Sequence, residues 1–177
     1  MVPGALVSRA PFRTPHGREE ANEFFGWNPD RYLDAEGEPY RAWEGDNIRS
    51  ARLPEPLLYL GKRVTSIRVH RLLVPVFEGL YAEIWKAKLW DPIKVYGGAY
   101  NFRLIRGGDE LSMHAFGAAV DHDPAANPLG APGEKCRLGN TVEGRAVVAI
   151  FRAWGFFWGG EFRGRKDCQH FQFGVGL

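Results

Sequence analysis

Two short stretches of the chain carry residue types that bind metal ions and move protons. The first runs from Ser112 to Asp121 with the spacing S-x-H-x-x-G-x-A-x-D, and the second is Asp167-Cys-Gln-His170. Together they provide two imidazoles and two carboxylates. Two imidazoles and one carboxylate would fill the three protein positions of a catalytic zinc site, with the fourth left for water. The other carboxylate would then stand beside the metal as a base.

The first stretch works as a metal site only if the chain turns between His114 and Asp121. A strand rises about 3.3 Å per residue, so an extended segment would hold the two side chains more than about 20 Å apart. Gly117 permits the reversal, because glycine adopts backbone conformations that other residues avoid. The small residues after it predict a short buried strand that reaches Asp121.

The second stretch leads into an alternating, aromatic segment, which predicts a strand over 168–173. His170 then shares a face with Cys168 and Gln172, while the phenylalanines between them face the core. A lone histidine near a lone aspartate is usually only a hydrogen-bonded pair, so the joint pattern is what favours a metal site. By position, His122 and Asp123 are rival ligands, although His122 should face away from Asp121.

The two motifs resemble those of the zinc D-alanyl-D-alanine carboxypeptidases and L-alanyl-D-glutamate endopeptidases. These enzymes cut peptidoglycan peptides and include many phage endolysins. The resemblance covers about residues 60–175 and rests on Ser112, His114, Gly117, Ala119, Asp121, Asp167, His170, Tyr100–Gly107 and Gly155–Gly160. Many relatives have Glu in place of Asp167, and the endolysin-like branch includes members with Asp.

The resemblance implies a Zn²⁺ ion held by His114, Asp121 and His170, with Asp167 as the catalytic base. It implies a peptidoglycan stem peptide as the substrate and a role for Ser112 in binding its backbone. The implied fold is that of DD-peptidases and hedgehog-type domains, an α+β fold with a small antiparallel sheet flanked by helices. We favour the endopeptidase because the chain is short, lacks a signal peptide and has Asp at the base position. The alternatives are a D-alanyl-D-alanine carboxypeptidase, a zinc-containing binding module without turnover, and a plain domain without metal.

Arg103 and Arg106 are candidates to bind a substrate carboxylate or the developing oxyanion. Residues 99–105 predict a strand, in which the two arginines would point to opposite faces. We therefore favour Arg103 as the arginine that takes part in catalysis beside Asp167, and keep Arg106 as a substrate-binding candidate. A surface arginine is the alternative for Arg103. Trp158 is the aromatic residue best placed to reach the cleft, although its neighbours are more typical of a core.

The rest of the chain supplies the supporting elements. Val69–Leu89 has the strongest helical periodicity, with Pro75 in its first turns and His70 before it as a capping or surface residue. Thr141 predicts a capped helix over 142–154 that ends at Gly155. The other expected elements are a helix over 18–25, an extended segment over 54–60, a turn over 96–99 and a long loop over 123–140.

The chain has 177 residues with 45% hydrophobic content, which fits one globular domain. We expect an irregular N-terminal wrap over 1–60 and a catalytic core over 61–177. The alternative for the wrap is a substrate rim that carries Trp27, Tyr32 or Trp43.

Charge, hydropathy and cysteine content exclude other classes. A net charge of +2 is too small to indicate nucleic-acid binding. No run approaches the roughly 18–20 apolar residues of a membrane span, and the N-terminus has no apolar core of a secretory signal. Cys136 and Cys168 leave one disulfide open but exclude a disulfide framework. We expect a monomer that is made in the cytoplasm and acts on the cell wall after release, as in phage lysis.

Overall fold

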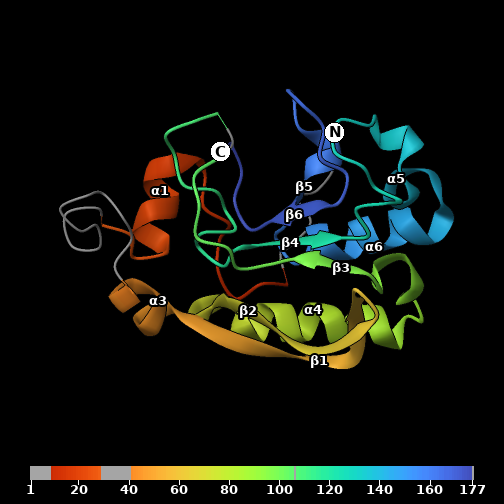
Figure 1. Ribbon diagram of the computed structural model, residues 1–177, viewed down its shortest axis with the longest axis horizontal. Coiled ribbons are helices and arrows are strands. Elements are labelled where there is room, and N and C mark those ends of the chain that lie inside the picture. The colour runs from red at the N-terminus through yellow and green to blue at the C-terminus, as the bar shows by residue number, and fades with distance from the viewer. Residues whose placement is uncertain (1–8, 29–40, 106, 177) are drawn as a thin grey trace, which may run out of the picture.

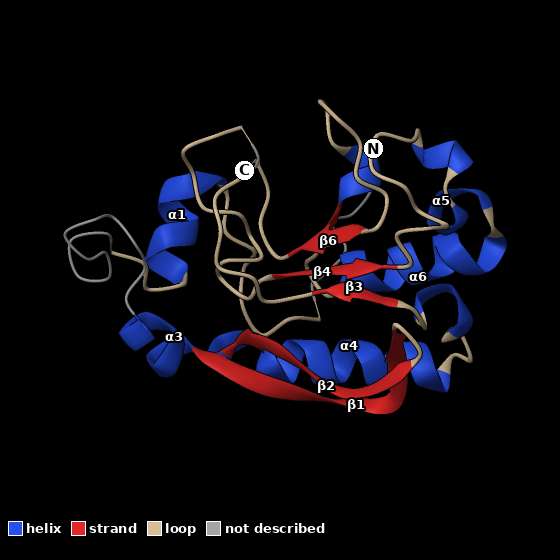
Figure 2. Cartoon of the chain, in the orientation of Figure 1, coloured by secondary structure: helices blue, strands red, loops and turns tan. Residues whose placement is uncertain are grey.

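Two antiparallel sheets and the helices around them form the described part of the chain (Figures 1 and 2). The computed structural model describes residues 9–28, 41–105 and 107–176. One sheet is a hairpin of β1 and β2, and the other has four strands in the order β3-β4-β6-β5. This arrangement confirms the predicted α+β class.

The helices and strands have the following bounds. The helices are α1 (Gly17–Phe24), α3 (Arg41–Asn47), α4 (Val74–Lys86), α5 (Arg137–Asn140) and α6 (Val142–Ala153). The strands are β1 (Ile48–Tyr59), β2 (Lys62–His70), β3 (Tyr96–Gly98), β4 (Ala119–His122), β5 (Phe157–Trp158) and β6 (His170–Gln172). None of the described helices has the length and apolar character that crossing a membrane requires.

The hairpin of β1 and β2 corrects the prediction of an irregular segment over 1–60. Its extended end confirms the expectation for 54–60, but the strand begins earlier, at Ile48. Pro54 and Pro56 lie where the register shifts, between Arg52 and Leu57. Proline donates no backbone hydrogen bond and is tolerated at such irregular positions. The prolines therefore hid a strand that continues on both sides of them.

Helix α4 packs against β1 and α6 and supplies much of the core. It begins at Val74, later than predicted, because Val69 and His70 complete β2. His70 caps the turn that follows, since its Nδ1 accepts a hydrogen bond from the Leu72 N–H at 3.3 Å. The predicted buried stripe is confirmed by Leu73, Val76, Phe77, Leu80 and Ile84, which have no exposed surface.

Two further helix predictions are confirmed. Thr141 caps α6, because its hydroxyl accepts a hydrogen bond from the Gly144 N–H at 3.0 Å, and the helix ends just before Gly155. Helix α1 ends within one residue of the predicted position. The N-terminal aromatics face the core: Trp43 has no exposed surface, and Trp27 packs against it with ring centroids 5.8 Å apart. Trp43 therefore forms no substrate rim, and Tyr32 lies outside the described residues.

The predicted strand over 99–105 is wrong, and the predicted turn before it is a strand. β3 spans Tyr96–Gly98 and pairs with β4. A Cβ atom on Gly97 would lie 2.8 Å from the Cβ of Asp121. Glycine is therefore required for the two strands to pair so closely, whereas in the sequence the Gly-Gly pair indicates a turn.

Cys136 and Cys168 form a disulfide, and both residues are fully buried. The bond connects the start of α5 to the segment just before β6. The segment over 123–140, which we predicted as a loop, therefore contains α5 and is attached to the four-stranded sheet. Neither sulfur is free to bind a metal ion.

Candidate metal centre

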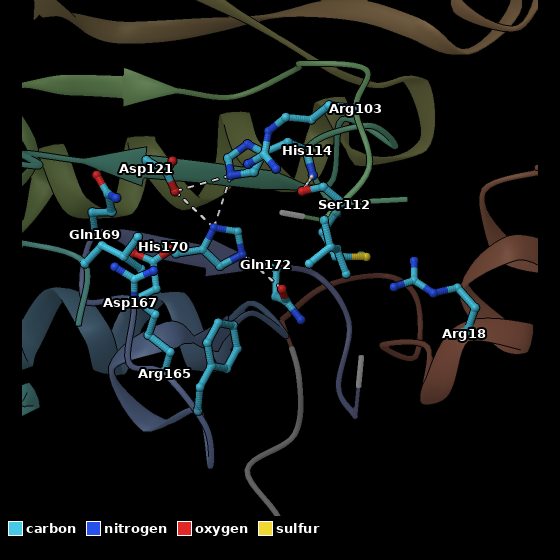
Figure 3. Close-up of a pocket in the computed structure, with 14 residues that line it drawn as sticks. Arg18, Arg103, Ser112, His114, Asp121, Arg165, Asp167, Gln169, His170 and Gln172 are labelled. Atoms are coloured by element: carbon cyan, nitrogen blue, oxygen red, sulfur yellow. Dashed lines mark hydrogen bonds and ion pairs between the residues drawn. The ribbon is translucent and has the colours of Figure 1, made fainter. Parts of the chain in front are cut away.

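His114, Asp121 and His170 converge on one point (Figure 3). Nε2 of His114 lies 3.1 Å from Nδ1 of His170 and 3.3 Å from Oδ1 of Asp121. Nδ1 of His170 lies 3.0 Å from the same oxygen. Within the described part of the chain, no other group of three His, Cys, Asp or Glu residues brings its ligand atoms within 4.8 Å of one another.

Two strands and one turn position these side chains. Asp121 on β4 and His170 on β6 are direct cross-strand partners, so they project from the same face of the sheet. His114 reaches them from a tight turn, in which the Gly117 N–H donates to the His114 carbonyl at 3.0 Å. Gly117 has a φ of 66°, and a Cβ there would lie 2.6 Å from the backbone nitrogen of His70. The turn therefore requires glycine at this position.

Each imidazole uses its outer nitrogen for a hydrogen bond to a carbonyl oxygen. His114 Nδ1 donates to the Ala99 carbonyl at 2.5 Å, and His170 Nε2 donates to the Gln172 side-chain oxygen at 2.9 Å. The Gln172 amide is oriented in turn, because its nitrogen donates to the Gly174 carbonyl at 3.1 Å. In the neutral form of each ring the proton therefore lies on the outer nitrogen, and the inner nitrogen presents a lone pair to the cluster.

This donor set fits a divalent cation. With both rings neutral, two lone pairs and a carboxylate oxygen face one another and no proton donor lies between them. The two imidazole lone pairs and the Asp121 oxygen repel one another, so a positive charge between them is needed to stabilise the arrangement. Two imidazoles and a carboxylate are typical protein ligands of catalytic zinc, and manganese or cobalt also accept them. The outer hydrogen bonds to Ala99 and Gln172 are of the kind that orient metal-binding histidines.

The charges within the cluster favour the ionised form of Asp121. Burial opposes ionisation of Asp121, but when an inner imidazole nitrogen carries a proton, its hydrogen bond to the carboxylate outweighs burial and holds the pKa of Asp121 well below its usual value. Burial also opposes a charge on His170, yet the Asp121 carboxylate outweighs it and raises the pKa of that imidazole. Asp121 is therefore an anion that can offset part of the charge of a bound metal ion.

Asp167 lies beside the cluster without being one of its three converging ligands. It lines the same cavity of about 380 Å³ as His114, Asp121 and His170. Its Oδ1 is buried and has no hydrogen-bond partner in the structure of the described residues. Burial raises the pKa of the Asp167 carboxyl. A carboxylate of this kind is suited to accept a proton and to return it.

The arginine and serine candidates that the structure describes line the same cavity. Ser112 and Arg103 both line it. The Ser112 hydroxyl oxygen accepts a hydrogen bond from the His114 N–H at 3.3 Å, so it also stabilises the turn. Arg103 donates to the Leu104 carbonyl at 3.1 Å and has no acidic partner within the described ranges. Arg106 lies outside the described residues.

Trp158 does not reach the cavity, contrary to the prediction. It lies in β5 with 6% of its surface exposed. Its indole nitrogen donates to the Cys168 carbonyl at 2.7 Å. The hydrogen bond holds the ring in the core next to the disulfide, where it supports the segment between Asp167 and His170.

The two rival ligand candidates, His122 and Asp123, lie outside the cluster. His122 faces away from the cluster: its Nδ1 donates to the Ile93 carbonyl and its Nε2 accepts from the Tyr81 hydroxyl, both at 2.9 Å. Burial lowers the pKa of His122 to about 4, so this residue is a neutral part of the core. Asp123 has a φ of 44° and pairs with Arg137 at 3.6 Å.

Sequence reasoning missed four residues around the site. The sequence predicted that Gln172 shares a strand face with His170, but we assigned Gln172 no role. Residues two apart in a strand lie on the same face, so a contact between these two side chains could have been predicted. Ala99 acts through its backbone carbonyl oxygen, and the residue type at that position gives no indication of such a contact. Arg18, from α1, and Arg165 also line the cavity. Arg18 is remote in sequence from both motifs, so nothing in its local pattern indicated this position.

Replacing Gln172 with leucine should lower zinc affinity by about 10–100-fold, because His170 loses the acceptor that orients its ring. Affinity can be measured by competition with a chromogenic chelator. Gln172→Glu is the matched variant: it retains an acceptor for the ring proton and should recover most of the loss. An unchanged affinity in Gln172→Leu would show that the hydrogen bond has no part in metal binding.

Comparison with known proteins gives a family match over the segment that carries the site. Residues 106–173 match the family model described as D-alanyl-D-alanine carboxypeptidase. No curated protein and no solved structure gives a significant match to the chain. The matched segment contains all three converging residues and Asp167. The segment that carries the site therefore matches the family that the resemblance of the two motifs predicted.

Proposed function

We propose that the protein is a zinc-dependent peptidase that cleaves peptidoglycan stem peptides as an L-alanyl-D-glutamate endopeptidase. The observation that carries this proposal is the convergence of two inward imidazole nitrogens and one carboxylate oxygen. They lie in the segment that matches the peptidase family. The cavity beside them supplies a carboxylate and arginines for the reaction.

His114, Asp121 and His170 would hold the zinc ion. When bound, the ion supplies a Lewis acid that makes water more acidic and polarises the scissile carbonyl. The outer hydrogen bonds of the two histidines keep their lone pairs directed inward. A substrate can approach this point because all three residues line the cavity.

Asp167 would move the protons of the reaction. Its carboxylate would take a proton from the attacking water and pass it to the amine of the leaving residue, whose bond to the carbonyl carbon breaks. Asp167 lines the cavity beside the cluster, where the water and the leaving amine would lie. The raised pKa of the Asp167 carboxyl makes it a better proton acceptor than an exposed aspartate.

Arg103 and Ser112 would bind the substrate. The Arg103 guanidinium is suited to a carboxylate of the peptide or to the negative charge that develops on the scissile oxygen. The Ser112 oxygen already accepts one hydrogen bond, which leaves its hydrogen free to bond a substrate carbonyl.

A D-alanyl-D-alanine carboxypeptidase is the second candidate, because that is the description of the matching family. A zinc-containing binding module is the third. The buried Asp167 Oδ1 argues against the binding module, because a site that only binds has no use for a base and an unpaired buried oxygen is destabilising.

Mass-spectrometric analysis of products from purified peptidoglycan tests these candidates. The endopeptidase should release peptides that begin at D-glutamate and leave L-alanine on the glycan. Release of D-alanine alone would assign the carboxypeptidase. A protein that binds one zinc per chain and releases neither product would be the binding module.

A further inference from the structure

A second cavity adjoins the metal cluster. It has a volume of about 320 Å³ and shares Arg103, His114 and Asp121 with the first cavity. We call it the tyrosine pocket, since Tyr59, Tyr96 and Tyr100 line it, together with the glycines of β3. The first cavity is the cationic pocket, which Arg18, Arg103 and Arg165 line. His114 and Asp121 of the cluster therefore line both pockets.

The two pockets differ in charge. Beyond the shared residues, the cationic pocket adds Arg165, Asp167 and Arg18, which pairs with Glu110 at 3.1 Å, whereas the tyrosine pocket adds no charged side chain. Arg165 has no ion pair within the described ranges, and Figure 3 shows Arg103 and Arg165 on opposite sides of the cluster. A ligand that spans both pockets would thus place its anionic part in one and an uncharged part in the other.

Tyr59 is held at the mouth of the tyrosine pocket by the end of the hairpin. The residue before it, Leu58, donates its N–H to the Lys94 carbonyl at 2.7 Å and forms a bridge with Val95. These contacts fix the hairpin beside β3. The Tyr59 side chain remains 47% exposed, and its ring lies 6.0 Å from that of Tyr96 at an angle of 71°. The pocket therefore has a rigid, exposed aromatic wall.

The floor of the tyrosine pocket is backbone. Gly97 and Gly98 of β3 line it, and the close approach of Gly97 to Asp121 leaves no room for a side chain at that position. A ligand can therefore approach the strand closely beside the cluster. Aromatic walls with hydroxyl groups suit a ligand with both apolar faces and polar substituents.

We propose that the tyrosine pocket binds the N-acylated amino sugar that carries the stem peptide, while the cationic pocket binds the acidic part of the peptide. This assignment rests on the proposed endopeptidase function. In that reaction the sugar and L-alanine lie on one side of the scissile bond, and the carboxylates of the stem lie on the other. The carboxylates match the arginines, and the C–H faces of the sugar match the tyrosine rings.

Two substrates with the same stem peptide, one with and one without the muramyl sugar, test the assignment. The wild type should have the lower KM for the muramyl peptide. Tyr59→Ser should raise that KM by about 3- to 10-fold and leave the KM for the free peptide unchanged. Leu60→Asn is the matched control, because Leu60 is 85% exposed on the same hairpin and does not line the pocket.

An equal effect of Tyr59→Ser on both substrates, or no effect on either, would overturn the sugar assignment while the peptidase function stands. The same holds if Leu60→Asn matches Tyr59→Ser. If the wild type cleaves neither substrate between L-alanine and D-glutamate, the proposed function itself fails, and the assignment fails with it.

Discussion

Asp167→Asn should reduce kcat for stem-peptide cleavage by about 10²–10⁴-fold and leave zinc bound at one ion per chain. Asparagine has nearly the shape of aspartate but cannot accept a proton from water at neutral pH. Asp167 lines the cavity beside the cluster without belonging to the group of converging ligand atoms. The metal should therefore stay while the proton transfer is lost.

Zinc content, measured by atomic emission, and kcat on a synthetic muropeptide check this prediction together. Asp123→Asn is the matched control, because Asp123 pairs with Arg137 and lines neither pocket. It should retain wild-type turnover. Loss of zinc in Asp167→Asn would make Asp167 a ligand, and unchanged turnover would exclude it as the base.

The pH profile gives the same prediction a second readout. A base acts only when ionised, and burial raises the pKa of Asp167 above the usual 3.8. With zinc in excess, kcat/KM should therefore fall as the pH drops through this raised value, at a higher pH than an exposed aspartate would give. The residual activity of Asp167→Asn should lack this acid limb.

His170→Ala should abolish stoichiometric zinc binding and all turnover. The loss of affinity should exceed the roughly 10–100-fold expected for a residue that only orients a ligand, because a direct donor is removed. Zinc should also no longer raise the melting temperature, since a ligand stabilises a protein only in proportion to its binding.

Titration calorimetry and thermal unfolding with and without zinc measure both effects independently of activity. His16→Ala is the matched control, because His16 is exposed and distant in sequence from both motifs. It should bind zinc as the wild type does. Full zinc occupancy in His170→Ala would mean that the cluster of His114, Asp121 and His170 is not the metal site.

More of the candidate site than of the fold could be predicted from the sequence, because the site residues belong to short, local patterns. The spacing of His114, Gly117 and Asp121 already required a turn, and the alternation after Cys168 indicated the face of His170. The direct pairing of Asp121 with His170 depends on strand register, which neither stretch contains alone. The spatial arrangement therefore needed the structure even where the residues were recognised.

The failures have physical causes that are specific to each segment. Gly97 was interpreted as part of a turn, although close contact with Asp121 is what requires it. Pro54 and Pro56 hid the strand β1, because they sit at its irregular point. Val69 and His70 fit a helix or a strand equally well, and pairing with β1 decided between them. Arg18 and Tyr59 reach the two pockets only through tertiary contacts, which local patterns do not encode.

The disulfide between Cys136 and Cys168 acts on the unfolded chain as well as on the folded one. It closes a loop with a sequence separation of 32, and restricting such a loop in the denatured ensemble is worth about 3–4 kcal/mol in the chain-entropy model. That is comparable to what a zinc ion at about 1,000 times its dissociation constant would add. The oxidation state of these two sulfurs should therefore change the unfolding free energy of the domain by about as much as a zinc ion bound at that concentration would.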